Sequence, residues 1–417
     1  MSNCYIFLVF FVFSFIAVAD WPQFLGPDRT GQVMDSNLTD DLVTRAPKEL
    51  WTVSVGEGFG GAAISKGDVF ILDRENDEND IIRCIELKSG NKKWSRRYRN
   101  EGRFSHNGSR SIPAVDDKYV FTIGCMGDVV CANRKDGVII WKKNLRTDWG
   151  SSPESWGYGQ SPVLYKDMII FAPLSKSAGV VALEKSTGKQ VWKTKDVGKK
   201  DGYASPIITK LLGQEMLVQQ SSDAVVGLNP STGKLLWSYG KYHVRWAIPA
   251  PVNVGGDRLF LSGGYGAGSA MIQLSKKGSK IVIAEVFRMN KKGSQIHAPL
   301  FYKGHLYANF NENDNLKKRS TKQGLTCIDL KGNIKWNTAD KPNLNRGNVI
   351  MVNNYLIALD GDTGELIYSI ANSVRYREIS RHKVLIGKGK KIWSPMALVG
   401  GFLVLRDQNE LKCLKIY

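Results

Sequence analysis

The amino-acid sequence predicts an all-β fold, an eight-bladed β-propeller of four-stranded antiparallel blades. A strand-like run that ends in a glycine-containing turn and is followed by a large aromatic residue occurs six times in the chain. The first four aromatic residues of this series, Trp94, Trp141, Trp192 and Trp237, follow one another at intervals of 47, 51 and 45 residues. A period of this length, built from short strands, is typical of a propeller blade.

Each repeat starts with small residues and, in six cases, a proline. Proline lacks the backbone N–H that a ladder needs, so it suits the start of a strand at the rim. Two further repeats start without proline, at 60–65 and 346–352, which brings the number of expected blades to eight. The six proline-containing starts are Ser111-Ile-Pro113, Ser161-Pro162, Ser205-Pro206, Pro249-Ala-Pro251, Ala298-Pro299 and Ser394-Pro395.

The last repeat reaches Tyr417 after three strands, so its outer strand has to come from elsewhere in the chain. The segment 49–55 contains Trp51, which precedes Trp94 by 43 residues and therefore fits the period. We expect this N-terminal strand to complete the last blade, because a closed ring leaves no open sheet edge. In the seventh repeat, we expect 360–364 to connect the second and third strands and 377–386 to form the outer strand.

The chain divides into three expected segments: a signal peptide at 1–19, an N-terminal arm at 20–48 and the propeller at 49–417. The signal peptide is indicated by an apolar run at 6–18 that ends in the small-residue pattern Ala17-Val-Ala19. That run is too short to cross a bilayer. We therefore expect an exported protein, periplasmic or secreted, that is a monomer and has no transmembrane segment in the mature chain.

The cysteines follow the repeat. Cys84, Cys131, Cys327 and Cys413 hold the third-strand position that Ala182 and Gly227 hold in other blades. A position shared by Cys, Ala and Gly requires a small residue, so we expect four buried free thiols. Cys125 lies across a short hairpin from Cys131, and either a strained bridge between these two or two free thiols is compatible with the sequence.

The net charge of +19 reflects basic groups at 96–99, 317–322 and 375–391. Two interpretations remain open: a solvated rim, or attraction to an anionic polymer or envelope surface. Nucleic-acid binding is not expected, because no recognition motif is present and the chain is predicted to be exported.

The residues that precede the first strands are the best candidates for a ligand site, because the innermost strands of a propeller surround its central channel. Phe59 and Arg245 belong to this group together with the eight residues given below. Aromatic and guanidinium groups suit planar or anionic ligands, and no carboxylate pair or metal-ligand set accompanies them. The alternative is that these bulky side chains only fill the channel. The candidate ligand-binding residues are Arg110, Trp156, Gln160, Tyr203, Trp246, His297, Arg346 and Trp393.

The repeat Ala182-LEKSTGKQV-Trp192 resembles that of pyrroloquinoline-quinone-type propellers, a group with quinoprotein alcohol dehydrogenases and non-enzymatic outer-membrane assembly propellers. The resemblance covers about 50–417, and Trp21-PQFLGPDRTG resembles the start of exported bacterial members. It implies, for an active dehydrogenase, adjacent cysteines over the cofactor, a tryptophan floor and Ca²⁺ held by Glu, Asn and Asp. The chain has no adjacent cysteines.

These observations favour a non-catalytic binding or scaffold propeller without a cofactor, and with a protein or an anionic envelope surface as its partner. Two alternatives remain. One is an alcohol or sugar dehydrogenase that uses pyrroloquinoline quinone and Ca²⁺ at an atypical site, and the other is a propeller that binds cell-wall polysaccharide.

Overall fold

A computed structural model describes residues 20–35, 37–195, 197–198, 202–310, 324–339, 341–386 and 391–417. The segment expected to be a signal peptide and the basic group at 317–322 therefore lie outside the described residues. Within the described part, no helix is both long enough and apolar enough to cross a bilayer.

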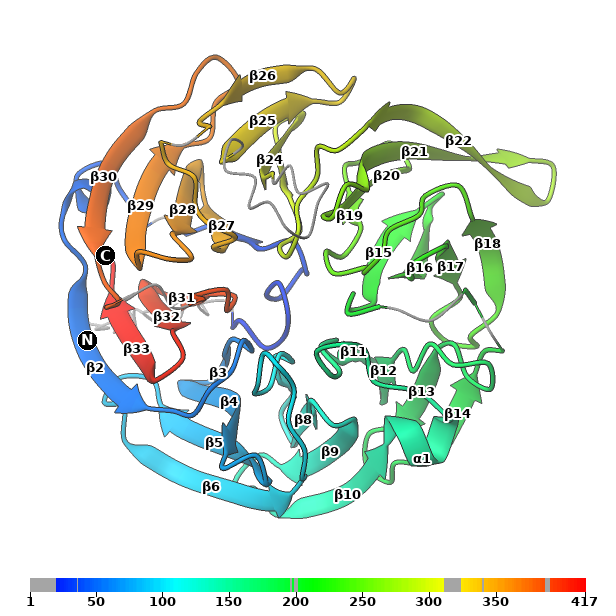
Figure 1. Ribbon diagram of the computed structural model, residues 1–417, viewed down its shortest axis with the longest axis horizontal. Helices are drawn as coiled ribbons and strands as arrows, with labels where there is room; N and C mark the ends of the chain where they lie inside the picture. The colour runs from blue at the N-terminus through cyan, green and yellow to red at the C-terminus, as the bar shows by residue number, and fades with distance from the viewer. Residues whose placement is uncertain are drawn as a thin grey trace, which may run out of the picture.

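Eight sheets form a ring of blades around a central axis (Figure 1). In each blade the chain runs outward through neighbouring antiparallel strands, as the repeat predicted. The strands of the first four blades are β3 (Ala63–Ser65), β4 (Asp68–Glu75), β5 (Asn79–Glu86) and β6 (Lys92–Arg99); β7 (Ala114–Val115), β8 (Tyr119–Ile123), β9 (Asp128–Asn133) and β10 (Ile139–Asn144); β11 (Val163–Tyr165), β12 (Met168–Phe171), β13 (Val181–Glu184) and β14 (Gln190–Lys193); and β15 (Ile207–Leu211), β16 (Gln214–Gln220), β17 (Val225–Leu228) and β18 (Leu235–Tyr239).

The next three blades follow the same order. Their strands are β19 (Val252–Asn253), β20 (Arg258–Gly263), β21 (Gly268–Lys277) and β22 (Lys280–Met289); β23 (Leu300–Tyr302), β24 (His305–Asn309), β25 (Leu325–Asp329) and β26 (Ile334–Asn337); and β27 (Val349–Val352), β28 (Tyr355–Leu359), β29 (Glu365–Ile370) and β30 (Glu378–Lys383). Two short helices, η1 (Leu42–Thr44) and α1 (Leu145–Trp149), lie outside the blades.

The eighth blade joins the two ends of the propeller. Its inner strands are β31 (Ala397–Val399), β32 (Phe402–Arg406) and β33 (Glu410–Lys415), and its outer strand is β2 (Lys48–Ser54). β2 pairs antiparallel with β33, with Trp51 opposite Cys413. This is the closure that the sequence predicted.

The repeated tryptophans and glycines lock neighbouring blades together. A Cβ atom added to Gly188, in the β13–β14 turn, would lie 2.8 Å from the ring of Trp141 in the preceding blade. The indole N–H of Trp141 donates to the Lys185 carbonyl in the same turn, at 2.8 Å. Trp51 makes the same pair of contacts with Gly90 and the Leu87 carbonyl, so the ring closes with the contact that joins blade 2 to blade 3.

The small third-strand residues lie opposite these aromatics. Cys84, Cys131 and Cys327 pair with Trp94, Trp141 and Trp336 in the ladders. The five described cysteines, Cys125 among them, are buried free thiols, so Cys125 and Cys131 are not bridged.

The N-terminal arm crosses one end of the central channel (Figure 1). Trp21 exchanges backbone hydrogen bonds with Ile64, and the Pro22 carbonyl accepts one from Val115. Further along, β1 (Gln32–Val33) pairs in parallel with β27 and gives that blade a fifth strand. Trp21 is 2% exposed. The arm is therefore an integral part of the ring and covers the channel from blade 1 to blade 7.

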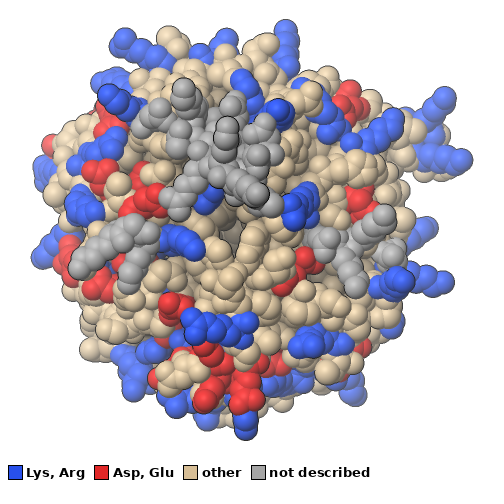
Figure 2. Space-filling view, in the orientation of Figure 1, with Lys and Arg blue, Asp and Glu red and all other residues tan. Residues whose placement is uncertain are grey.

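Charge is spread around the molecule. In the space-filling view, Lys and Arg side chains stand around the periphery, with Asp and Glu between them (Figure 2). Several of these groups are paired, such as Lys412 with Glu49 across the closing strands at 3.0 Å.

Candidate ligand-binding cavity

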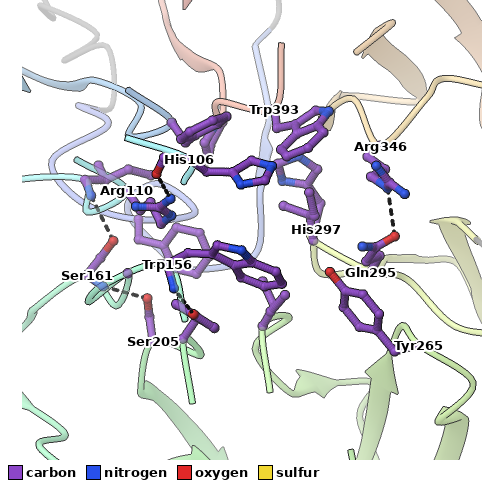
Figure 3. A pocket seen from close by; sticks show the side chains of 18 residues that line it. His106, Arg110, Trp156, Ser161, Ser205, Tyr265, Gln295, His297, Arg346 and Trp393 are labelled. Atoms are coloured by element: carbon purple, nitrogen blue, oxygen red, sulfur yellow. Dashed lines mark hydrogen bonds between the residues drawn. The ribbon is translucent and has the colours of Figure 1, made fainter. Parts of the chain in front are cut away.

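The connections that lead into the innermost strands meet at one end of the channel. Successive strands of a blade run in opposite directions, so every first strand starts at the same face. A cavity of about 290 Å³ lies at this point (Figure 3). It is lined by Phe24, Phe59, His106, Arg110, Ile112, Trp156, Gly159, Ser161, Tyr203, Ser205, Ile248, Tyr265, Gln295, Ile296, His297, Arg346, Trp393 and Pro395.

The arm supplies part of the cavity wall. Phe24 lines the cavity and also packs against the apolar cores of blades 1–2 and blades 4–5. The arm crosses the end of the channel at which the first strands finish, opposite to the end at which they start. The channel is therefore a cup that is closed at its far end by residues before the propeller.

Two groups of aromatic rings form walls of the cup. Trp393 stacks on Phe59 with ring centroids 5.5 Å apart, and on His106 at 6.0 Å. On the second wall, Trp156 stacks on Tyr203 at 5.7 Å. His106 meets Trp156 edge to face, at 66°, so the two walls stand at a steep angle to each other (Figure 3).

Arg110 brings a partly buried positive charge to the cup. Its guanidinium donates to the backbone carbonyls of Gly108 and His106 and lies 5.2 Å from the centre of the Phe59 ring. Burial lowers the pKa of Arg110 to about 10, and Tyr203 opposes this shift. Among the described residues, no carboxylate forms an ion pair with Arg110. Its charge is held by carbonyl dipoles and an aromatic face alone.

Arg346 brings a second guanidinium from the start of blade 7. Its Nε donates to Gln295 Oε1 at 2.8 Å, and its Cζ lies 5.4 Å from the centre of the Trp393 ring. These contacts orient the planar guanidinium beside the first aromatic wall (Figure 3). A fixed guanidinium presents its N–H groups in the geometry that carboxylate and phosphate oxygens accept.

His106 stands between the two walls and contacts a lysine. Its Nε2 lies 2.8 Å from Lys391 Nζ. The pKa of His106 is lowered first by burial and then by the charges of Lys391, Arg110 and Arg346. A neutral imidazole accepts a hydrogen bond from an ammonium group, so this contact holds Lys391 at the edge of the cup.

His297 has a fixed tautomer. Asn348 Oδ1 accepts a hydrogen bond from the Met396 N–H at 3.0 Å, which leaves its Nδ2 to donate to His297 Nδ1 at 3.2 Å. The proton of the neutral ring is therefore on Nε2. Burial lowers the pKa of His297 to about 4, against the opposing effect of the backbone carbonyls of Arg346 and Trp393. His297 is thus neutral at pH 7.

The structure brings six of the eight candidate residues to the cavity wall, namely Arg110, Trp156, Tyr203, His297, Arg346 and Trp393. Gln160 is 2% exposed, and its amide bonds both the N–H and the carbonyl of Ala172, so it holds neighbouring backbone together. Trp246 lies behind the second wall, 4.8 Å from Trp156, with Arg245 over its outer face at 4.3 Å. That the six residues bind a ligand stays a prediction.

The sequence reasoning missed several cavity residues, four of them with large polar or aromatic side chains. His106 precedes Arg110 by four residues in the same connection, and this closeness to a predicted residue was a usable signal. Tyr265 belongs to the glycine-rich loop between β20 and β21, and Gln295 precedes the sixth blade. Phe24 comes from the arm, whose path across the channel no repeat could indicate.

A calcium-held quinone does not fit these residues. Ca²⁺ requires six to eight oxygen ligands, with carboxylates among them. No Asp or Glu lines the cavity, and within the described part of the chain no group of three His, Cys, Asp or Glu could hold a metal ion. Positive charge at the cup comes instead from Arg110, Arg346 and Lys391.

Comparison with curated proteins shows partial similarity to quinoprotein dehydrogenases. The chain is 25% identical over 164 residues to quinoprotein alcohol dehydrogenase PedH of Pseudomonas putida, covering 38% of this chain and 27% of that one. It is 28% identical over 216 residues to quinoprotein ethanol dehydrogenase of Pseudomonas aeruginosa, covering 44% of this chain and 34% of that one. The matches span about a third or less of the relatives' length.

Solved structures share the fold. BamB from Moraxella catarrhalis superposes with a TM-score of 0.58 at 13% identity, covering 89% of this chain and 98% of that one. A europium-containing methanol dehydrogenase gives a TM-score of 0.66 at 11% identity, covering 93% and 89%. A family model described as outer membrane protein assembly factor BamB matches residues 78–338, more than half of the chain. The chain therefore belongs to this family of propellers with pyrroloquinoline-quinone-type repeats.

Proposed function

We propose that this protein is an exported, non-catalytic binding or scaffold propeller whose cup binds an anionic ligand with a flat ring system. The observation that carries the proposal is the partly buried Arg110, which has cavity space beside it and no carboxylate to pair with among the described residues. Loss of water from a cation is costly unless an anion compensates its charge, and this loss already lowers the pKa of Arg110. A bound carboxylate or phosphate would supply that compensation.

The aromatic walls support a flat ring as the rest of the ligand. Trp156 and Trp393 stand on walls that are steeply inclined to each other. A ring that stacks on one wall therefore points its edge at the other, which is a favourable aromatic arrangement in both contacts. Arg346 lies over Trp393, so an acidic group on the ring edge reaches a guanidinium without leaving the wall.

Pyrroloquinoline quinone is a suitable probe, since it is flat and carries several carboxylates. Quenching of tryptophan fluorescence would report its binding, with Ca²⁺ and with a chelator. We expect binding that does not depend on Ca²⁺. Arg346→Ala is expected to weaken it by about tenfold to a hundredfold, because a hydrogen bond to a charged group contributes roughly 1.5–3 kcal/mol.

Arg97→Ala provides the matched control. Arg97 lies on an outer strand, exposed, in an ion pair with Glu75. Its loss is expected to leave the affinity unchanged. Equal losses from the two substitutions would assign binding to the charged rim, and such binding would also fade with added salt.

A dehydrogenase is the second candidate, favoured by the partial similarity to quinoprotein dehydrogenases. If the protein is a dehydrogenase, it should take up the quinone in a Ca²⁺-dependent way and reduce an electron-accepting dye with alcohols or sugars. The absence of both, with binding retained, is the outcome that we expect.

The family description supports a further part of the proposal, namely a protein partner in the cell envelope. The cup and the rim are separate surfaces, so a scaffold role and ligand binding are compatible. A cell-wall polysaccharide is the remaining alternative ligand. It predicts that acidic oligosaccharides compete with the quinone for the cup.

A further inference from the structure

The face opposite to the opening of the cup is built from short turns. In blades 1–7, the turn from the first to the second strand and the turn from the third to the fourth strand emerge on this face, because successive strands are antiparallel, and blade 8 has the first of these turns. Several first turns are only two residues long, such as 66–67, 166–167 and 303–304. We call this surface the turn face. The N-terminal arm also lies on this face, and the β21–β22 hairpin, with ten residues in each strand, projects from the ring (Figure 1).

Basic residues recur on the turn face. The turns between third and fourth strands carry Lys88, Lys135, Lys189, Lys234 and Lys331, all exposed. These turns contain a single acidic residue, Asp136. None of the five lysines forms an ion pair within the described part of the chain. The outer part of the turn face is thus rich in lysine, with Glu86, Glu184 and Asp329 at the adjoining strand ends.

The inner turns add lysine at positions that disfavour it. Lys66, Lys166 and Lys303 have φ values of 48°, 50° and 43°, a left-handed backbone that Asn, Asp and Gly adopt more readily. Lys166 and Lys303 are exposed and make no ion pair among the described residues. The inner turns also carry Asp116, Asp117, Asp167 and Asp257. Lys66 pairs with Asp117 at 2.6 Å, so the unpaired positive charge of these three lysines comes from Lys166 and Lys303.

The two most exposed large apolar side chains lie on the same face. Met34 is 81% exposed and Val374 is 82% exposed, whereas the next such residues reach 53%. Met34 follows β1 beside the first turn of blade 7, where Asp35 bonds Asn353. Val374 belongs to the β29–β30 turn of the same blade, next to Arg375 and Arg377.

We propose that the turn face docks on the surface of a bilayer that contains anionic lipids. Lysines within reach of lipid phosphates supply attraction, and the apolar side chains of Met34 and Val374 enter the region below the headgroups. A soluble anionic polymer would use the lysines but offers nothing to the two apolar side chains. In this orientation, the cup opens away from the bilayer and stays accessible to a soluble ligand.

Co-sedimentation with vesicles tests this surface. The two compositions are phosphatidylcholine alone and an equal mixture of phosphatidylcholine and phosphatidylglycerol. We expect binding to the mixture at low salt, weakening as salt is added. Lys166→Asn with Lys303→Asn should reduce the affinity by about thirtyfold, since each lysine near an anionic surface is worth about fivefold. Asn suits the left-handed turn, so this variant is expected to remain folded.

The matched control is Lys241→Asn with Lys291→Asn. Both lysines are exposed and lie in connections on the cup face, and Lys291 also has a left-handed backbone, with φ 63°. We expect their replacement to leave vesicle binding unchanged. Met34→Ser with Val374→Ser should weaken binding to the mixture while preserving its dependence on salt.

Three results would overturn the proposal. One is equal binding to both kinds of vesicle, and another is an equal loss in the control variant. The third is binding to dextran sulfate with no binding to anionic vesicles, which would assign the turn face to a soluble polymer.

Discussion

A single residue of the cavity wall, His297, makes the stability of the folded protein depend on pH. Its pKa falls from 6.5 to about 4 because burial penalises the charged ring. The unfolded chain therefore takes up a proton at a higher pH than the folded chain does. The resulting stabilisation is present in full above pH 6.5 and is lost as the pH falls towards about 4.

We expect the wild-type protein to lose stability more steeply than His297→Gln between these two pH values, by at most about 3 kcal/mol. Denaturant unfolding at pH 7 and at pH 4.5 measures the difference, and the carboxylates that titrate in both proteins cancel in the comparison. Parallel losses in the two proteins would show that His297 is already protonated in the folded state.

A second prediction concerns the reactivity and the replacement of the third-strand cysteines. Burial raises the pKa of Cys84, Cys327 and Cys413 to about 12, so these thiols stay protonated and unreactive. Replacing any one by Ala should cost about 1 kcal/mol, because Ala already serves at 182. Native-state alkylation followed by mass mapping should find all three unlabelled, and a disulfide between any two would contradict the prediction.

The equivalent position in blade 4 differs from these, and the sequence did not reveal it. A Cβ atom on Gly227 would lie 2.1 Å from Trp237 Nε1, and this indole donates to Met216 Sδ instead of a carbonyl in the next blade. The repeat correctly predicted that the position is small. In blade 4 this position excludes even Ala, because the Trp237 indole is rotated towards it. A pattern of residue types does not indicate such a rotation.

At the scale of the element, the lock between tryptophan and turn glycine joins one blade to the next. Gly188 has a φ of 69°, and any Cβ atom there would press on Trp141. Gly188→Ala should therefore cost about 2–4 kcal/mol, from overpacking together with the left-handed backbone. Thermal unfolding measures the loss.

Gly213→Ala is its matched control. Gly213 has a φ of 80° in the turn between β15 and β16, and nothing lies within 4 Å of an added Cβ atom. Only the backbone penalty applies there, about 1–2 kcal/mol. If the two substitutions cost the same stability, packing against Trp141 would not be the reason for glycine at 188.

Some of these structural elements were predictable from the sequence, and others were not. Strand periodicity indicated the blades because each blade repeats one pattern of burial. The pairing of β1 with β27 involves only two residues, in an arm without periodicity, and was not foreseen. In the cavity, Arg110 and Arg346 were predicted because ring closure gathers the strand starts. Gln160 also precedes a strand, yet its side chain turns into the backbone of its own blade, a direction that depends on the path of the local loop.

For the whole molecule, closure and the cup depend on different parts of the N-terminal segment. Deletion of 20–54 removes β2, which leaves β33 as an open edge and removes the contact of Trp51 with Gly90. We expect this variant to aggregate and to lose its single unfolding transition, since an unpaired edge strand recruits other chains. A soluble monomer with one cooperative transition would contradict closure by β2.

Deletion of 20–33 alone keeps β2 and Trp51 and removes the segment that crosses the channel, with Phe24, together with β1. This variant should stay monomeric, because the closing strand remains paired, and should be less stable, because buried Trp21 is lost. Its cup is open at both ends, so water reaches the charges that a ligand would compensate, and charged hydrogen bonds weaken. Fluorescence titration with pyrroloquinoline quinone should then show weaker binding than in the full chain. Unchanged affinity would mean that the arm closes the ring without shaping the site, and the binding residues would lie only on the walls that face the open end.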